Sequence, residues 1–225
     1  MLRFVALVAM TICALATMVA ADEPAVQRED IEWSQIWIPH LNEHNLPRVF
    51  CVGDSICNAY YDGVANALQG KAYVAKLATS SSLGDPALLD QMKYMLSNYQ
   101  FDVIHFNNGL HGFGYTEEQY KADIPKLLAM IKQLAPNAKL IWATSTPMRN
   151  RDNLAELSPD NPRVVARNEI VVDMAAKEGI PVNDLYSLVV DHPEYWTGDA
   201  IHFQPEGQAV EAQQVAKYIE DALAK

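Results

Sequence analysis

The residues with the clearest catalytic potential are a serine in the first third of the chain and an aspartate and a histidine near its end. Ser55 follows an apolar run within Gly53-Asp54-Ser55, and Asp199 lies three residues before His202. A serine hydroxyl needs a base near neutral pH, and that base needs a partner that fixes its tautomer. We therefore predict that Ser55, Asp199 and His202 form a triad for acyl transfer.

Each of these residues also has a simpler interpretation. Gly-Asp-Ser occurs in ordinary turns, where the aspartate and serine side chains bind their own backbone. Likewise, Asp199 could cap a turn and His202 could be a surface histidine. The presence of all three residue types in one chain favours the catalytic interpretation.

Acyl transfer also requires N–H donors for the negative oxygen of the tetrahedral intermediate. The backbone N–H of Ser55, at the start of an expected helix, is one candidate. Gly84 can bring its N–H close to a substrate because it has no side chain. Asn108 is the candidate for a side-chain donor, with Asn107 in reserve. Taken singly, the glycine and the asparagines are also ordinary turn residues.

Short β-rich runs alternate with helical stretches along most of the chain. Five such units predict a five-stranded parallel sheet covered by helices on both faces, a three-layer α/β/α fold. In such sheets ligands bind beyond the carboxyl ends of the strands, where Ser55 and the asparagines are expected. The expected strands are residues 48–52, 73–77, 103–106, 140–143 and 181–182.

Several helix boundaries are marked by capping residues. Thr116 begins a capping box for a helix that Pro125 should kink or delay. Pro162 is placed to open another helix, and Gly179 to end it in a left-handed conformation. Pro205 is placed to open the last helix. Two connections, residues 145–160 and 185–204, are longer than usual and are candidate functional loops.

The chain begins like a secretory precursor. Arg3 precedes an apolar run over residues 4–19 and the small residues Ala20 and Ala21. This run is shorter than the roughly 20 residues that span a membrane. We predict a signal peptide over residues 1–21, a secreted or periplasmic location, and no stable membrane insertion after cleavage. An uncleaved anchor is the alternative.

The mature chain is expected to form one domain over residues 47–225. Before it, residues 22–46 are predicted to be a polar leader followed by a short helix from Ile31 to Leu46. The aromatic residues Trp33 and Trp37 in that helix are expected to pack on the domain.

Charge and cysteine usage exclude some classes of partner. The formal net charge is −11 without a basic cluster, which argues against nucleic acid. Cys51 and Cys57 do not form a CxxC pair, so we expect two buried thiols and no metal or other cofactor. His105 is expected in the core, whereas His111 could line the pocket. The oligomeric state is open.

The proposed triad and oxyanion donors resemble those of the SGNH, or GDSL-type, hydrolases. The signature residues of that family are Ser, Gly, Asn and His, in four sequence blocks. Residues 53–56 match the first block, Gly84 the second and residues 199–202 the last. The third block departs, because the usual Gly-x-Asn-Asp is replaced by residues 106–111, Phe-Asn-Asn-Gly-Leu-His. The resemblance implies a flavodoxin-like fold and esterase, lipase or carbohydrate deacylase activity without metal.

The expected function is therefore hydrolysis of a small acyl ester through an acyl-enzyme. Export and an acidic surface suggest an acetyl group on a small molecule or polysaccharide as the substrate. One alternative is an O-acyltransferase that uses the same site. Another is a non-catalytic module that retains the fold to bind a glycan.

Overall fold

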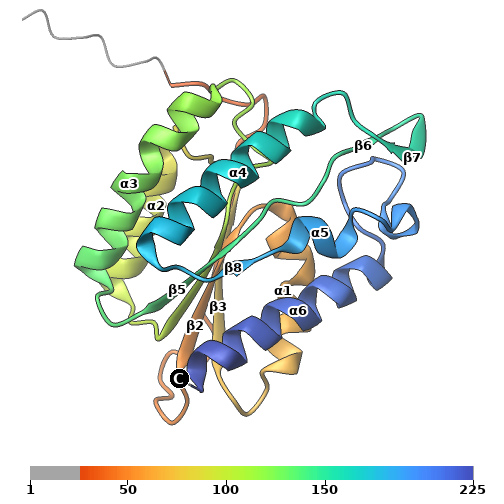
Figure 1. The fold of residues 1–225 in the computed structure, drawn as a ribbon. Helices are drawn as coiled ribbons and strands as arrows, with labels where there is room; N and C mark the ends of the chain where they lie inside the picture. The colour runs from red at the N-terminus through yellow and green to blue at the C-terminus, as the bar shows by residue number, and fades with distance from the viewer. Residues whose placement is uncertain (1–25, 225) are drawn as a thin grey trace, which may run out of the picture.

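A computed structural model describes residues 26–224, and its centre is a six-stranded sheet (Figure 1). The strand order is β1-β3-β2-β4-β5-β8, and all neighbours are parallel except the antiparallel pair β1 and β3. The five predicted parallel strands are thus confirmed. The sheet strands are β1 (Ser34–Trp37), β2 (Arg48–Gly53), β3 (Tyr73–Thr79), β4 (Val103–Asn107), β5 (Lys139–Ala143) and β8 (Val182–Asn183).

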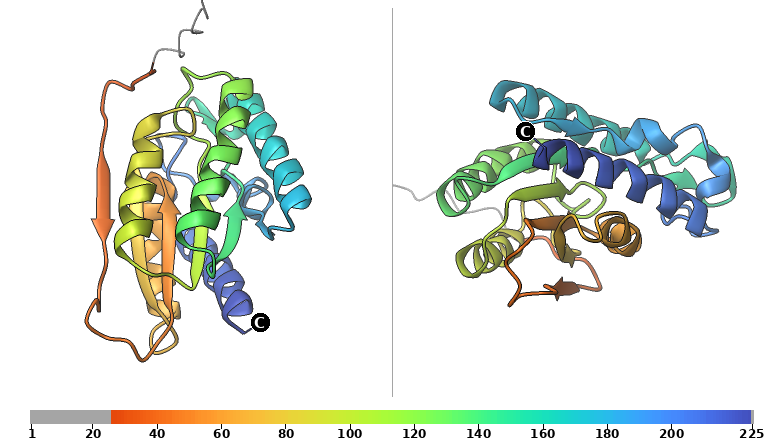
Figure 2. Two further views of the ribbon diagram at one scale, coloured as in Figure 1. Left: turned by 90° about the vertical axis from the view of Figure 1, so that its left-hand side faces the viewer. Right: turned by 90° about the horizontal axis from the view of Figure 1, so that it is seen from below.

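Helices cover both faces of this sheet, as the predicted three-layer architecture requires (Figure 2). One buried apolar cluster lies between the sheet and helices α1, α5 and α6, and a second between the sheet and α2, α3 and α4. The first three helices are α1 (Ser55–Ala67), α5 (Leu185–Val189) and α6 (Pro205–Leu223); the others are α2 (Pro86–Asn98), α3 (Glu117–Leu134) and α4 (Asn161–Glu178).

The topology places a crevice beside β2. Among the parallel strands the spatial order is β3-β2-β4-β5-β8, which is the flavodoxin-like order 2-1-3-4-5. From β2 the chain moves outward to β3 and then returns to β4 on the other side. Loops that leave the carboxyl ends of β2 and β4 therefore diverge, and the space between them is where such folds bind ligands.

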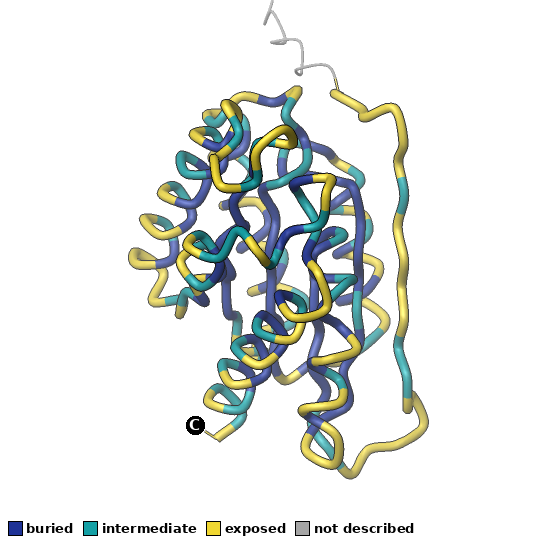
Figure 3. Tube along the Cα trace, turned by 90° about the vertical axis from the view of Figure 1, so that its right-hand side faces the viewer, coloured by how far each residue is buried: buried dark blue, intermediate teal, exposed yellow. Residues whose placement is uncertain are grey.

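The parallel strands at the centre of the sheet are the most buried part of the molecule, whereas β1 at its edge is exposed (Figure 3). Every residue of β2 and β4 is buried, because apolar side chains on both faces of these strands contact helices. The loops that begin at the strand ends are therefore attached to a rigid support.

The helix boundaries follow the predicted signals closely. Thr116 and Gln119 form both hydrogen bonds of a capping box, and Gly179 ends α4 with a left-handed φ of 67°. Pro162 lies in the first turn of α4, and Pro205 opens α6. The predicted delay at Pro125 is wrong, since α3 begins directly after its cap and contains the proline.

The predicted helix over residues 31–46 is wrong. The segment instead contains the strand β1, whose residues pair antiparallel with β3 from Ser34–Thr79 to Trp37–Lys76. Trp33, Ile36 and Trp37 have a spacing that fits a helix face, but β3 offers a free edge of N–H and C=O groups. Pairing with that edge satisfies the backbone, and Pro39 prevents a helix from continuing through the segment.

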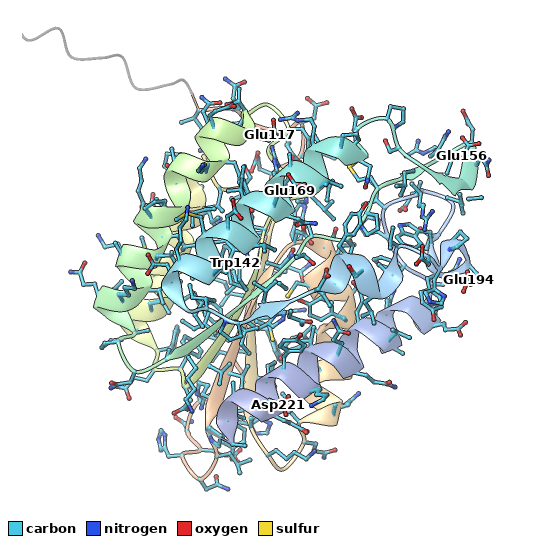
Figure 4. The ribbon with its side chains drawn as sticks, in the orientation of Figure 1. Glu117, Trp142, Glu156, Glu169, Glu194 and Asp221 are labelled. Atoms are coloured by element: carbon cyan, nitrogen blue, oxygen red, sulfur yellow. The ribbon has the colours of Figure 1, made fainter. Side chains whose placement is uncertain are left out.

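The two long connections contain structure that the sequence did not predict. The first folds into a hairpin of β6 (Arg149–Asn150) and β7 (Asn153–Leu157), and the second contains α5 and the 3₁₀ turn η1 (Pro193–Tyr195). β7 contacts η1, and the labelled Glu156 and Glu194 lie at the same end of the molecule (Figure 4). The guanidinium of Arg149 also lies 4.6 Å from the ring centre of Trp196.

The predicted signal peptide and its cleavage site lie outside the described residues. Between residues 26 and 224, no helix is long and apolar enough to cross a membrane. Cys51 and Cys57 are free, buried thiols, as predicted, and burial raises the pKa of Cys57 to about 12.

Candidate active site

Ser55 lies at a tight turn between β2 and α1. Asp54 is the N-cap of α1, and its carboxylate accepts a 2.9 Å hydrogen bond from the N–H of Ile56. Gly53 permits the turn because a Cβ there would lie 2.5 Å from the Cβ of Cys57. Ser55 is therefore the first residue of the helix, where backbone N–H groups have no partner within the helix.

The structure brings Ser55, Asp199 and His202 together. His202 Nε2 lies 2.8 Å from Ser55 Oγ, and His202 Nδ1 lies 2.7 Å from Asp199 Oδ2. The two ring nitrogens thus join a hydroxyl to a carboxylate through hydrogen bonds of ordinary length. This is the arrangement in which an imidazole can accept the proton of a serine.

Asp199 is held as an anion by donors around it. Partial burial alone would raise its pKa, but the N–H and ring of His202, the N–H of Ile201 and the hydroxyl of Thr197 outweigh that effect. The pKa of Asp199 consequently lies well below its usual range. Asp199 is therefore charged near neutral pH and favours an imidazole with its proton on Nδ1.

The loop that carries Asp199 and His202 depends on an unusual backbone conformation. Ala200, between them, has a φ of 68° and is only 2% exposed. Its carbonyl accepts a 2.9 Å hydrogen bond from the N–H of Arg149, at the start of the hairpin. An alanine in the left-handed region costs about 1 kcal/mol, so the surrounding contacts must maintain this turn.

Substitutions at Ala200 should separate backbone strain from side-chain contacts. Ala200→Gly should keep the melting temperature and kcat close to wild type, because glycine adopts a positive φ without strain. Ala200→Val should lower stability by about 1–2 kcal/mol, because a branched Cβ is least tolerated there. It should also lower kcat by displacing His202. Thermal melts and p-nitrophenyl acetate turnover test both, and an Ala200→Val variant equal to wild type would contradict the expectation.

The site is open to solvent. The side chains of His202 and Asp199 are 42% and 44% exposed. Three surface hollows of about 270, 350 and 580 Å³ are lined by residues outside the triad. Because the base and its partner are themselves half exposed, a bulky alcohol can approach Ser55 from the surface.

Gly84 lies in the loop after β3, in a conformation that requires glycine. Its φ is 101°, and a Cβ there would lie 2.9 Å from the ring of Tyr115. The neighbouring N–H of Leu83 donates a 2.9 Å hydrogen bond to Asn108 Oδ1. The loop that carries Gly84 is thus tied to the loop after β4.

The two asparagines differ in the hydrogen bonds they make. Asn107 Nδ2 donates to the carbonyls of Ala143 and Thr144, at 3.0 and 2.9 Å, which uses both of its hydrogens. Asn108 Nδ2 donates to the carbonyl of Ser81 at 3.1 Å, which uses one. An amide nitrogen has two hydrogens, so within residues 26–224 Asn108 keeps one without a partner, whereas Asn107 keeps none.

Two other histidines, His105 and His111, are held by hydrogen bonds outside the triad. His105 is fully buried and bonds Asn183 at 3.0 Å, as expected for a core histidine, and burial lowers its pKa to about 4. His111 bonds the carboxylate of Glu29 at 2.8 Å.

Residues 51–210 match the GDSL-like lipase/acylhydrolase family. The chain belongs to this family. It is therefore an enzyme of the ester-hydrolysing acylhydrolase type, in agreement with the resemblance seen in the sequence.

Solved structures confirm the fold of this GDSL-like acylhydrolase. A GDSL-like lipase from Bacteroides thetaiotaomicron is similar with a TM-score of 0.63 and 16% identity, covering 78% of this chain and 89% of its own. An acetylxylan esterase from Geobacillus stearothermophilus has a TM-score of 0.61 and 15% identity, covering 77% and 94%. A carbohydrate esterase family 3 protein from Talaromyces cellulolyticus has a TM-score of 0.63 and 14% identity, covering 80% and 99%. No match was found among curated proteins.

Arg167, which no sequence pattern had singled out, holds the loop after β4 in this acylhydrolase. The side chain is 1% exposed and donates hydrogen bonds of 2.7–3.0 Å to the carbonyls of Gly109, His111 and Gly112. It also pairs with Glu117 at 3.5 Å, near the start of α3 (Figure 4). In the sequence, the sign of this role was an arginine at a position on the buried face of the helix that became α4.

Glu211 is a second residue that the sequence did not single out. It lies on α6 and is fully buried, and burial followed by the charge of Asp54 raises its pKa well above the usual value. Burial therefore favours the protonated form of Glu211 at this position behind the serine turn.

Proposed function

We propose that this acylhydrolase is an exported serine esterase with Ser55 as nucleophile, His202 as general base and Asp199 as its orienting partner. The observation that carries this proposal is the continuous pair of hydrogen bonds from Ser55 through His202 to Asp199. Ser55 Oγ and His202 Nε2 are already within hydrogen-bond distance, so the first proton transfer needs no rearrangement of either side chain.

In the first half-reaction, Ser55 Oγ attacks the ester carbonyl while its proton moves to His202 Nε2. The carbonyl oxygen becomes negative, and the N–H groups of Ser55 and Gly84 and the free amide hydrogen of Asn108 are the proposed donors for it. The carbon–oxygen bond to the alcohol then breaks, and His202 returns the proton to that leaving oxygen. The product is an acyl-enzyme on Ser55.

In the second half-reaction, water replaces the alcohol. His202 accepts a proton from water as the water oxygen attacks the acyl carbon, and the same donors stabilise the new oxyanion. Collapse releases the carboxylic acid and returns the proton to Ser55 Oγ. Asp199, with its lowered pKa, remains charged throughout and stabilises the transient imidazolium.

The proposed substrate is a small acyl ester, in particular an acetyl ester, carried by a carbohydrate. The half-exposed triad supports a bulky alcohol partner because it leaves room for a polymer at the surface. Two solved structures of similar fold are named as carbohydrate-directed esterases, although their identity to this chain is only 14–15%. The predicted signal peptide would place the enzyme where such polymers occur.

Acetate release from acetylated xylan tests this substrate proposal. The wild-type mature chain should release acetate, whereas Asp199→Ala should release very little. An added acceptor alcohol should not divert most of the acetyl group to a new ester, as it would for an acyltransferase. Release of fatty acid from long-chain lipids without release from acetylated glycans would contradict the proposed substrate.

A further inference from the structure

A segment outside the family match contacts both loops that supply proposed oxyanion donors. Residues 26–33, here called the N-terminal strap, precede β1, whereas the family match begins at residue 51. The strap runs along one end of the molecule, as the red-orange trace that leads into β1 shows (Figure 2), and most of its residues are exposed (Figure 3). Its contacts, however, are concentrated on the loops after β3 and β4.

Arg28 binds the loop that carries Gly84. Its guanidinium forms an ion pair with Asp85, whose side chain is only 3% exposed. The other carboxylate oxygen of Asp85 accepts a 2.8 Å hydrogen bond from the N–H of Ala87 and caps α2. Arg28 thus neutralises a buried carboxylate directly after Gly84, and such a charge is costly when it has no partner.

Glu29 binds the loop that follows Asn108. One carboxylate oxygen accepts a 2.9 Å hydrogen bond from the N–H of Gly112, and the other lies 2.8 Å from His111 Nδ1. Both contacts lie on the segment whose carbonyls are held from the opposite side by Arg167. The loop is therefore fixed between α4 and the strap.

Two further contacts connect the strap to these loops. The N–H of Gln27 donates a 2.8 Å hydrogen bond to the hydroxyl of Tyr115, whose ring lies under Gly84. Trp33 exchanges hydrogen bonds with Ser80, through its N–H to Ser80 Oγ at 2.9 Å and its carbonyl from Ser80 N–H at 3.0 Å. The strap thus contacts the Gly84 loop at both of its ends.

We propose that Arg28 and Glu29 are positioning residues for the oxyanion hole, each acting through one loop. This inference rests on the proposed function, because it assigns Gly84 and Asn108 as donors. The Asn108 side chain joins the two loops on the inside. The strap joins them on the outside and limits how far Gly84 and Asn108 can move apart.

The expected effect is on the transition state. Donors of an oxyanion hole act only at a defined distance, and a misplacement of about 1 Å can cost about 100-fold in rate. Glu29 is more exposed than Arg167 and lies at the molecular surface, so its removal should loosen the loop without unfolding the domain. A loss of about tenfold in kcat, with KM little changed, is expected for Glu29→Ala.

The test compares variants of the strap with a control variant that removes an exposed ion pair elsewhere. Glu29→Ala and Arg28→Ala are assayed for kcat, KM and melting temperature with p-nitrophenyl acetate. Glu29→Gln should recover much of the rate, because its amide oxygen can still accept from Gly112. Lys71→Ala removes an exposed 2.6 Å pair with Glu220 and should leave kcat unchanged.

A double-mutant cycle shows whether the strap acts through the oxyanion donor. The loss of kcat from Glu29→Ala should be much smaller in an Asn108→Ala background than in the wild type, because coupled residues are not additive. Full additivity would overturn the positioning role, since a merely structural effect would persist without Asn108. Loss of stability with unchanged kcat would overturn it as well.

Hydrogen exchange separates this inference from the proposed function. In Glu29→Ala, amides in residues 109–115 should exchange faster, and in Arg28→Ala those in residues 80–85 should do so, while those of β2 should not change in either variant. Unchanged exchange in both loops would overturn the strap's role whatever the activity. If the wild-type enzyme showed no ester turnover but exchange became faster in the variants, the proposed function would be contradicted. The contacts by which the strap holds the loops would still be supported.

Discussion

Ser55→Ala is expected to abolish ester hydrolysis, with a loss in kcat of about 10⁶-fold. Without the hydroxyl, His202 has no nucleophile to activate, although the oxyanion donors remain. Turnover of p-nitrophenyl acetate by wild type and variant, under identical conditions, measures the loss. A variant that retains more than about one hundredth of the wild-type rate would contradict the role of Ser55.

The fold should survive this substitution, which makes the comparison interpretable. The helix cap is supplied by Asp54, and the hydroxyl of Ser55 bonds only to His202 among the described residues. Alanine also has the highest helix propensity. Circular dichroism and melting temperature should therefore match those of the wild type.

Asp199→Asn is expected to lower kcat by about 10⁴-fold while the fold is retained. An asparagine keeps an oxygen for the N–H groups of Ile201 and His202, so the turn can persist. The amide cannot stabilise the imidazolium, and it can favour the wrong tautomer of His202. Kinetics with p-nitrophenyl acetate measure the effect; a decrease below about tenfold would mean that Asp199 does not serve the base.

The lowered pKa of Asp199 also predicts the shape of the pH profile. A carboxylate whose folded pKa is depressed stabilises the native state above its unfolded pKa, and this contribution disappears as the pH falls through the folded value. Because its pKa is lowered, Asp199 should stay charged across the acid limb of activity and add no ionisation to it. Measurement of kcat/KM against pH should show one ionisation there; two would indicate that Asp199 also titrates.

Much of the fold could be predicted because its signals are local. The buried runs of β2 and β4, the capping box at Thr116 and the left-handed Gly179 depend mainly on neighbouring residues. The strand β1 could not be predicted in the same way. Its spacing suits a helix, and only the free edge of β3, distant in sequence, determines that it pairs as a strand.

In the site, too, features set by neighbouring residues could be predicted, whereas contacts between distant residues could not. The spacing of Asp199 and His202 indicated a shared turn, and the strand-to-helix junction indicated the place of Ser55. The contact between them joins residues 147 positions apart and depends on the sheet. Arg167 donates hydrogen bonds to carbonyls more than 50 positions away, and no pattern in the neighbouring sequence indicates such a role.

Covalent labelling of Ser55 is the most direct test of the proposed mechanism. A p-nitrophenyl phosphonate should add one phosphonyl group per chain, release one p-nitrophenolate, and be located by peptide mass spectrometry on Ser55. Labelling should disappear in Ser55→Ala and slow markedly in Asp199→Asn. A wild-type enzyme that hydrolyses esters but is labelled at another residue, or is not labelled at all, would contradict Ser55 as the nucleophile.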